Sequence, residues 1–381
     1  MSMVKINKVF ALVFLTSYIL ACSKQAVIVE SQYGVLSSGE QVRQFLLTND
    51  KGCSLQLTDY GARIISIRMP DRKGVIDDVI VGPGCLDSLE KGRQCRFFGC
   101  VLGRYANRIN NSAFTLEGEI CNVDANENIR GVPVHCHGGE RGFDRFVWES
   151  ESISEEGRLG VRFHRMSPDL ESGFPGNCDC HVTYWLDNDN RIKVEYEATT
   201  DKTTIINMSN HSYFNLKGHL GGYVMDHRLV VEADSCIQNN LQKCPDLVLP
   251  VEDTPFDFRS PNRVDYRIDK PNRQLEIMHG MSACWCIKGW DGSLRKAADL
   301  YDPLSGRGVE IWTTEPALLT YTGRNFDGRV IGKYGPIEKF SGMLLETMHF
   351  ADSPNQSRFP STVLHPGEKY YSSTEWHFYA K

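Results

Sequence analysis

The pattern that most constrains the fold is a series of short runs in which apolar and polar residues alternate, each ended by a turn rich in Gly, Asn or Asp. In residues 192–197 the sequence IKVEYE alternates apolar with charged side chains, which is typical of a half-exposed strand. The preceding residues 187–190, DNDN, predict a hairpin turn that joins this run to another at 181–186. Further runs with strand character lie at residues 42–48, 54–58, 62–69, 75–81 and 161–164.

Helical periodicity is scarce, and only residues 85–91 predict a short helical turn. No Pro/Ser-rich linker divides the chain after residue 30. Although 381 residues would suffice for two average domains, large all-β folds often exceed the average domain length. We therefore predict an all-β protein, with residues 31–381 forming one large β-sandwich domain.

The first residues predict a targeting segment rather than part of this domain. Two lysines precede an apolar run at residues 9–21, and the run ends in Ile-Leu-Ala before Cys22. This order resembles a bacterial lipoprotein signal, in which the cysteine after the cleavage point is acylated. We expect residues 1–21 to be the signal peptide and residues 22–30 to be a short tether. A lipid on Cys22 should hold the protein at a membrane of the cell envelope, on the periplasmic side. A plain secretory signal is the alternative.

Composition narrows the classes of partner. A net charge of −6 and the lack of a long basic run argue against nucleic acid, whose binding depends on Lys and Arg at phosphates. We expect a monomer.

Twelve of the 13 cysteines remain once Cys22 is set aside, and their spacing does not match zinc sites. Cys178 and Cys180 should point the same way on a strand, as should Cys284 and Cys286. We expect most cysteines to be small buried apolar residues, and disulfides remain open.

The most suggestive stretch is residues 203–216, TTIINMSNHSYFNL, which begins as a β-branched run and ends around His211. A histidine exchanges a proton near neutral pH, so it suits acid–base chemistry. Several polar side chains around it could bind a hydroxylated ligand or fix the ring tautomer: Asn207, Asn210, Ser212, Tyr213 and Asn215. The alternative is a core histidine satisfied by its neighbours.

Two loops depart from the strand pattern in the first half of the chain. In GRYANRI, residues 103–109, Arg104 and Arg108 could bind an oxygen-rich ligand through their forked guanidinium groups, or could form surface ion pairs. In residues 135–144, glycines allow a ligand to approach the backbone closely. His135 and His137 could also be metal ligands there, if a third ligand exists.

Two stretches in the second half carry carboxylates. Trp290 and Asp291 suit a sugar, because an indole can stack on the ring and a carboxylate can accept hydroxyl protons; an ordinary Asp-Gly turn is the alternative. Glu346 closes an apolar strand, LLET, where a carboxylate without a partner is costly to bury. Glu346 is therefore either functional or paired with an arginine.

Taken in order, the motifs GRYANRI, HGGERGFDRFVW, SPDLESGFPGN, SNHSYFNL, TPFDFR, GWD, TTEPALLTYTG and LLET…ADSPNQSRFPSTVLHPGE resemble those of the aldose 1-epimerases, also called galactose mutarotases. The resemblance spans the chain from Tyr33 to Tyr379. It implies a galactose mutarotase-like β-supersandwich that interconverts the α and β anomers of free aldoses without a metal or cofactor. It also implies roles for six residues: Glu346 as general base, His211 as general acid, and Asn107, Arg108, His137 and Asp291 at sugar-binding positions.

The chain departs from the family pattern at three places. Leu319 and Met348 stand where the family often has Gln, and Ala351 stands where it has Pro. Because the proposed acid and base remain, we expect activity to be kept and the sugar preference to differ.

Three other functions are consistent with the same scaffold. One is a carbohydrate-binding protein without turnover, although an intact acid–base pair argues against it. Another is a glycosidase, in which Glu346 and Asp291 would flank a glycosidic bond at a separation of ~5–10 Å. The third is an epimerase for a phosphorylated sugar, which would require extra basic residues at the site.

Overall fold

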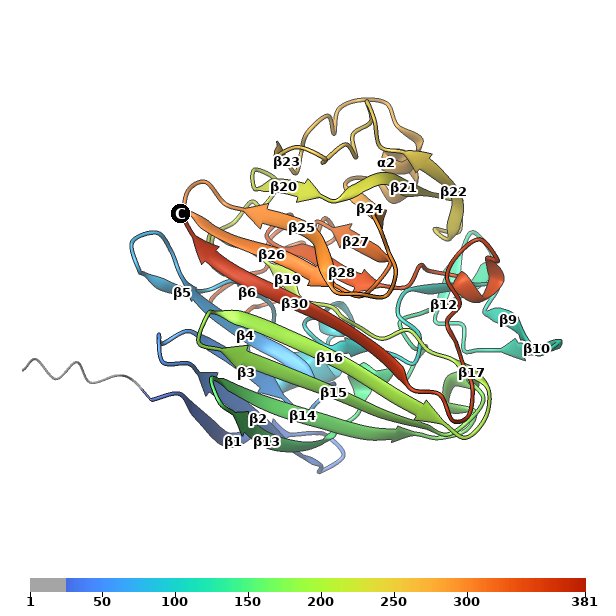
Figure 1. Ribbon diagram of the computed structural model, residues 1–381, viewed down its shortest axis with the longest axis horizontal. Helices are drawn as coiled ribbons and strands as arrows, with labels where there is room; N and C mark the ends of the chain where they lie inside the picture. Colours follow the sequence, from blue (N-terminus) through green and yellow to red (C-terminus); the bar gives the residue numbers. More distant parts are fainter. Residues whose placement is uncertain (1–24) are drawn as a thin grey trace, which may run out of the picture.

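Three antiparallel sheets make up most of the protein in the computed structural model, which describes residues 25–381 (Figure 1). The nine-stranded sheet has the order β13 (Glu149–Glu155), β14 (Arg158–Ser167), β15 (Cys178–Asp187), β16 (Arg191–Thr200), β30 (Tyr370–Ala380), β26 (Arg307–Thr313), β25 (Arg295–Tyr301), β20 (Arg228–Val231) and β23 (Asn262–Arg263). The seven-stranded sheet has the order β22 (Pro245–Pro250), β21 (Ala233–Asn239), β24 (Ser282–Ile287), β27 (Ala317–Tyr321), β28 (Met343–Met348), β19 (Tyr213–Phe214) and β6 (Ile80–Val81). The five-stranded sheet runs from β1 (Val27–Val35) through β2 (Gln41–Thr48), β3 (Ser54–Thr58) and β4 (Arg63–Pro70) to β5 (Ile76–Asp78).

Short pairings and two short helices complete the fold. The small sheets are β10 (Glu119–Asn122) with β9 (Ala113–Leu116), β11 (Glu127–Ile129) with β12 (Val132–Cys136) and β8 (Arg108–Asn110), β17 (Thr204–Ile205) with β29 (Val363–Leu364), and β18 (Ser209–Asn210) with β7 (Val101–Leu102). The helices are α1 (Leu86–Lys91), where the sequence predicts a helical turn, and α2 (Arg273–Met278).

The nine-stranded sheet contacts both other large sheets through one continuous apolar core. Phe163 on β14 meets Phe45 on β2 edge-to-face, with ring centroids 6.0 Å apart. Trp376 on β30 meets Phe214 on β19 in the same manner at 5.5 Å. Burying one such side chain contributes about 1.5–3 kcal/mol, so this core is the main source of stability. The predicted all-β sandwich is confirmed.

Local details follow the sequence pattern closely. On β16, Ile192, Val194 and Tyr196 are buried while the residues between them are partly exposed. The predicted hairpin joins β15 to β16, and its turn is held by Asp187 Oδ1, which accepts hydrogen bonds from the backbone N–H groups of Asp189 (2.8 Å) and Arg191 (2.9 Å).

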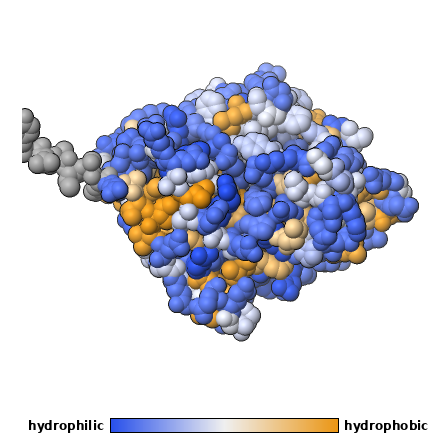
Figure 2. Space-filling model, turned by 60° about the horizontal axis from the view of Figure 1, so that its bottom comes forward, coloured by the Kyte–Doolittle hydropathy of each residue, from blue (hydrophilic) through white to orange (hydrophobic). Residues whose placement is uncertain are grey.

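The N-terminal end differs in part from expectation. Strand β1 begins at Val27, where it pairs with Thr48, so residues 27–30 of the predicted tether belong to the sheet. Apolar side chains are exposed on this sheet, including Val27, Val29 and Leu46, and Figure 2 shows apolar side chains gathered where the described chain begins. The predicted signal peptide and Cys22 lie outside the described residues.

Two properties of residues 25–381 bear on the predictions about membranes and cysteines. No helix in this part of the chain is long and apolar enough to span a membrane. The twelve cysteines of this part all carry free thiols, and most are buried. The Sγ atoms of Cys178 and Cys180 lie 3.5 Å apart, as expected for neighbours on one face of a strand.

Arg104 has a structural role and is not the ligand-binding residue that the sequence allowed. Its side chain is buried, and it donates hydrogen bonds to the carbonyl oxygens of Pro175 (2.8 Å) and Gly176 (2.9 Å) and to Ser167 Oγ (2.7 Å). The guanidinium fork therefore ties the loop after β7 to the segment between β14 and β15, and it has no role at a ligand.

We expect Arg104→Met to lower the free energy of unfolding by about 3 kcal/mol or more, because it leaves several buried carbonyl groups without donors. Urea unfolding monitored by tryptophan fluorescence measures the change. Arg162→Met is the matched control, since Arg162 is exposed and forms only a surface ion pair with Glu151, so its change should stay within about 0.5 kcal/mol. Equal losses in the two variants would contradict the structural role of Arg104.

Candidate active site

A cavity of about 1110 Å³ opens against one face of the seven-stranded sheet. Strand alternation supplies its floor: Leu344, Glu346 and Met348 of β28 line the cavity, while Met343 and Leu345 point into the core. Neighbouring strands contribute in the same way, with Leu319 and Tyr321 from β27, Ser282 and Cys284 from β24, and Ile237 and Asn239 from β21. Loops from the first half of the chain form the opposite wall, including Phe97, Asn107, Arg108, His137 and Glu140.

Glu346 is the only one of these floor residues that carries a charge, and its carboxylate has no partner in the described chain. The residue is 0% exposed, and neither carboxylate oxygen accepts a hydrogen bond within residues 25–381. Burial raises its pKa from the ordinary 4.5 to about 8, and the charge of Arg108 opposes this shift. No Lys or Arg of the described chain lies within ion-pair distance of it. The alternative of an arginine salt bridge therefore does not hold there.

His211 reaches the same cavity from the turn between β18 and β19. Its backbone is fixed on both sides, because its N–H donates to the carbonyl oxygen of Cys100 (2.9 Å) and its own carbonyl accepts from the N–H of Gly99 (2.8 Å). The ring centroid lies 5.9 Å from that of Phe97, 5.2 Å from His137 and 5.3 Å from Tyr213. Burial lowers the pKa of His211 to about 4, so its imidazole is neutral at pH 7.

The asparagines around His211 hold the backbone in place rather than line the cavity. Asn207 Nδ2 donates to the carbonyl of His349 (3.2 Å), Asn210 Nδ2 donates to that of Gly99 (2.8 Å), and Asn215 Nδ2 donates to that of Ser341 (2.9 Å). The stretch also forms only brief strands, since it connects three separate sheets instead of extending one. Of its polar and aromatic members, His211 and Tyr213 line the cavity.

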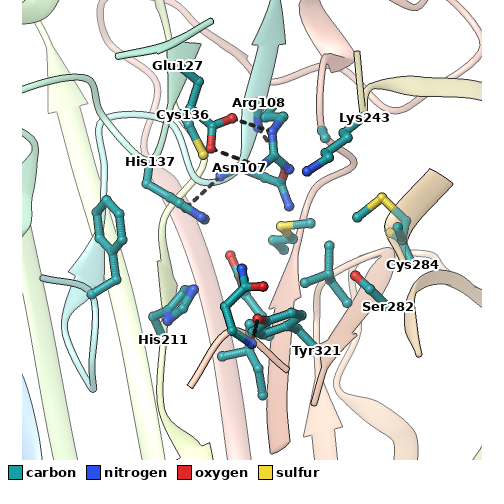
Figure 3. Close-up of a pocket in the computed structure, with 18 of the residues that line it drawn as sticks. Asn107, Arg108, Glu127, Cys136, His137, His211, Lys243, Ser282, Cys284 and Tyr321 are labelled. Atoms are coloured by element: carbon teal, nitrogen blue, oxygen red, sulfur yellow. Dashed lines mark hydrogen bonds and ion pairs between the residues drawn. The ribbon is translucent and has the colours of Figure 1, made fainter. Parts of the chain in front are cut away.

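Three of the predicted sugar-binding residues lie together on the opposite wall (Figure 3). The N–H of Asn107 donates to His137 Nδ1 (3.1 Å), which leaves the proton of a neutral His137 ring on Nε2. Arg108 makes a two-pronged ion pair with Glu127, with Nε–Oε2 and Nη2–Oε1 distances of 2.7 and 3.1 Å. Burial lowers the pKa of His137 well below its usual range, and the nearby His211 adds to the effect. These contacts hold Asn107, Arg108 and His137 in fixed orientations.

Asp291 is not brought to this cavity, so the structure does not support its predicted sugar-binding position. Its exposed carboxylate accepts hydrogen bonds from the N–H (2.8 Å) and Oγ (2.6 Å) of Ser293, as in an ordinary Asp-Gly turn. Trp290 is likewise away from the cavity lining and donates its indole N–H to the carbonyl of Thr314 (2.8 Å). The motif closes a turn between β24 and β25 instead of contacting a ligand in the cavity.

Several cavity residues could not be selected from the sequence alone. Ser282, Lys243 and Arg324 line the cavity but belong to no motif that marks them. Ser282 alternates with Cys284 along β24, which was a readable signal, whereas Lys243 and Arg324 lie on turns whose positions depend on sheet pairing.

A potential metal-binding group lies elsewhere, on an open sheet face. The side chains of His164, Asp179 and His181 bring their ligand atoms within 4.8 Å of one another on β14 and β15. They already pair among themselves, with His164 Nε2 at 2.7 Å from Asp179 Oδ1. His135, one of the histidines considered for a metal, is buried and contacts the carbonyl of Asp124 through Nδ1 (2.8 Å).

Comparison with solved structures agrees with this architecture. The galactose 1-epimerase of Lactobacillus acidophilus NCFM superposes with a TM-score of 0.81 at 26% sequence identity, covering 93% of this chain and 99% of its own. The GalM/aldose epimerase homologue of C. elegans superposes with a TM-score of 0.77 at 24% identity. The fold is therefore that of the galactose mutarotase-like proteins.

Sequence comparison then defines the family. The family model described as aldose 1-epimerase matches residues 43–377. Galactose mutarotase of Homo sapiens is 35% identical over 358 residues, which cover 93% of this chain and 99% of the relative, and aldose 1-epimerase of Escherichia coli (strain K12) is 33% identical over 351 residues, covering 90% and 97%. The chain belongs to the aldose 1-epimerase family.

The burial of Glu346 predicts a pH-dependent stability difference. The pKa of Glu346 is higher in the folded than in the unfolded chain, so the folded protein keeps this proton to a higher pH. Below pH 4.5 the carboxyl is protonated in both states and does not lower the free energy of unfolding. As the pH rises from 4.5 through 8, the carboxyl lowers the free energy of unfolding increasingly, because only the unfolded chain ionises it readily. We expect Glu346→Gln to be more stable than wild type at pH 8.5 by about 1–3 kcal/mol, with the difference shrinking toward pH 5.

Urea unfolding at pH 5, 7 and 8.5 measures this difference. Glu156→Gln, in an exposed turn, serves as the control and should show no such trend. A Glu346→Gln variant that is less stable than wild type at pH 8.5 would show that the carboxylate has a stabilising partner.

Proposed function

We propose that the protein catalyses the interconversion of the α and β anomers of free aldoses, with Glu346 and His211 as the acid–base pair. The observation that carries the proposal is a fully buried carboxylate with no partner in residues 25–381, in the same cavity as a histidine whose main chain is fixed by backbone hydrogen bonds. Such a carboxylate is costly to keep in a fold unless it acts on a ligand. Family membership supports the same reaction.

The reaction requires two proton transfers at different oxygens. A ring-closed aldose is a hemiacetal, which opens when the anomeric hydroxyl loses its proton and the ring oxygen gains one. Glu346 takes the first proton and His211 supplies the second. The aldehyde then rotates about the C1–C2 bond and the ring closes on the other face, with the two roles reversed.

The pKa values of the pair favour a single shared proton. Between about pH 4 and pH 8, Glu346 and His211 together hold one proton, and these pKa values place it on the carboxyl. Ring opening starts from the form in which His211 carries the proton and Glu346 is ionised. This form has the same total charge as the form with the proton on Glu346. A bound sugar that donates its anomeric hydroxyl to the carboxylate favours the form with ionised Glu346, because a hydrogen bond to an ionised group stabilises it.

The opposite wall supports positioning of the sugar. Asn107, Arg108 and His137 present fixed donors, and holding a substrate in the reactive geometry contributes directly to rate. Phe97, Tyr213 and Tyr321 add aromatic surface on which the apolar face of a pyranose can lie.

The three departures from the family pattern all lie on the cavity lining. Leu319 is paired in register with Glu346, and Met348 and Ala351 lie further along the chain on the same lining. Apolar side chains cannot replace the hydrogen bonds of glutamine, so sugar hydroxyls on this side lose partners. We therefore expect a sugar preference different from that of the galactose mutarotases to which the chain is similar.

The alternatives have less support. A glycosidase needs two carboxylates across a glycosidic bond, and the partner first considered, Asp291, lies outside the cavity. A pure carbohydrate-binding protein would not require an unpaired buried carboxylate.

Polarimetry tests the proposed reaction. Freshly dissolved α-D-glucose and α-D-galactose should approach anomeric equilibrium faster with the wild-type protein than in buffer alone. His211→Asn should reduce the enzymatic rate by about 10²–10⁴-fold, because proton transfer by a positioned group contributes that much. His181→Asn, on the exposed sheet face, is the control. A fully active His211→Asn variant would contradict the assigned acid.

For the N-terminus we propose a lipid-anchored protein of the bacterial cell envelope, supported by the lipobox-like end of the apolar run before Cys22. We expect Cys22→Ala to move the protein from the membrane fraction to the soluble fraction of cells that process lipoproteins. Ser23→Ala is the control and should stay with membranes. Membrane fractionation of Cys22→Ala identical to wild type would contradict lipidation at this residue.

A further inference from the structure

The cavity carries positive charge in a protein that is negative overall. Six cationic side chains line it, namely Arg93, Arg96, Arg108, Arg145, Lys243 and Arg324, against three carboxylates, Glu127, Glu140 and Glu346. The whole chain has a net charge of −6. A concave site with the sign opposite to that of the protein attracts anionic ligands.

Three of these cations are paired with two carboxylates of the protein itself, Asp144 and Glu127. Arg96 binds Asp144 through two hydrogen bonds of 2.8 and 3.0 Å, and Arg145 also approaches Asp144. Arg108 is paired with Glu127. These three arginines are fixed by the protein's own carboxylates and shape the cavity wall.

Lys243 and Arg324 differ, because neither forms an ion pair or a side-chain hydrogen bond anywhere in residues 25–381. Both are half-buried, and Arg324 Nε is enclosed without an acceptor. Partial burial lowers the pKa of Lys243, with further contributions from Arg108 and Arg324. An enclosed guanidinium N–H without an acceptor is costly, and a carboxylate, phosphate or sulfate is the group that satisfies it best. Arg93 also has no ion-pair partner among residues 25–381, but its side chain is exposed.

Sheet register places these two cations beyond the same end of the cavity floor. On β24, Ser282 pairs with Tyr321 of β27, and Cys284 pairs with Ile237 of β21. Lys243 lies on the turn that follows β21, and Arg324 lies three residues after Tyr321. Figure 3 shows Lys243 with its amine toward the space that Asn107 and Arg108 border.

The same register gives the direction from the reacting groups to these cations. Glu346 pairs with Leu319, and Leu344 pairs with Tyr321, so the floor advances by two residues, about 7 Å, from Glu346 to the row next to Arg324. A sugar with its anomeric carbon at Glu346 and His211 and its ring along the floor in this direction would bring its far end toward Lys243 and Arg324.

We propose that the substrate is an anionic aldose, with its acidic group held by Lys243 and Arg324 at the end of the cavity remote from Glu346. A carboxylate, as in a hexuronic acid, a sulfate and a phosphate share the required chemistry. This inference rests on the proposed anomer interconversion and narrows its substrate class. The extra basic residues that an epimerase for a charged sugar requires are thereby present at the site.

NMR exchange spectroscopy tests the proposal, because it follows the exchange between the two anomeric proton signals at equilibrium for any aldose. The probes are D-galactose and D-glucose, D-galacturonate and D-glucuronate, D-galactose 6-sulfate and D-glucose 6-phosphate, each corrected for exchange without enzyme. We expect kcat/KM for at least one acidic sugar to exceed that for its neutral parent by about tenfold or more. The arm with the highest value identifies the acidic group.

Charge-removing variants connect the preference to these two residues. Lys243→Met and Arg324→Met should each reduce the ratio of acidic to neutral kcat/KM about tenfold, mainly through KM, and Lys243→Arg should retain most of it. Lys73→Met removes one positive charge from an exposed turn away from the cavity and should leave the ratio unchanged. The wild-type ratio should also fall with added salt.

The outcomes separate the inference from the function on which it rests. Exchange of neutral aldoses equal to or faster than that of every acidic aldose overturns the anionic substrate while leaving the epimerase intact. An acidic preference that survives both methionine variants also overturns the assigned site. Exchange of none of the six sugars above background contradicts the proposed epimerase itself.

Discussion

The burial of one carboxylate determines how the site must work. Glu346 lies on a central strand of a sheet whose other face belongs to the apolar core, and it has no partner in residues 25–381. Isolated burial of a charge is among the most unfavourable features that a fold can contain. The native state reduces this cost by keeping the proton on Glu346, which raises its pKa to about 8. The group is thereby ready to exchange a proton with whatever enters the cavity.

The rest of the structure maintains that condition. The sheet fixes the direction of Glu346, because alternation along β28 sends every second side chain to the cavity. Backbone hydrogen bonds fix the main chain at His211, and the Asn107–His137 contact orients a second imidazole ring. The asparagines of the His211 segment supply the hydrogen bonds that a chain crossing between three sheets cannot obtain from regular pairing.

Much of this could be predicted from the sequence because it depends on local pattern. Strand alternation predicted the sandwich, and the motif around Glu346 and His211 predicted two residues that share the cavity. Prediction was less successful where a residue's role depends on distant partners. Arg104 has the same local signals as Arg108, yet carbonyl groups of residues 167–176 surround only Arg104. Asp291 follows an aromatic residue, as a sugar-binding carboxylate could, but its turn closes on Ser293. Lys243 and Arg324 are brought to the same end of the cavity floor only by sheet register, which a single sequence does not specify.

The most direct test of the role of Glu346 is the rate of anomer exchange in Glu346→Gln, measured by exchange spectroscopy at saturating sugar beside the wild type. Glutamine keeps the shape of the side chain but cannot accept and return a proton. The exchange rate of the folded variant should fall by about 10²–10⁴-fold while the sugar still binds. Wild-type exchange in a folded Glu346→Gln protein would contradict the central claim that this buried carboxylate transfers the proton.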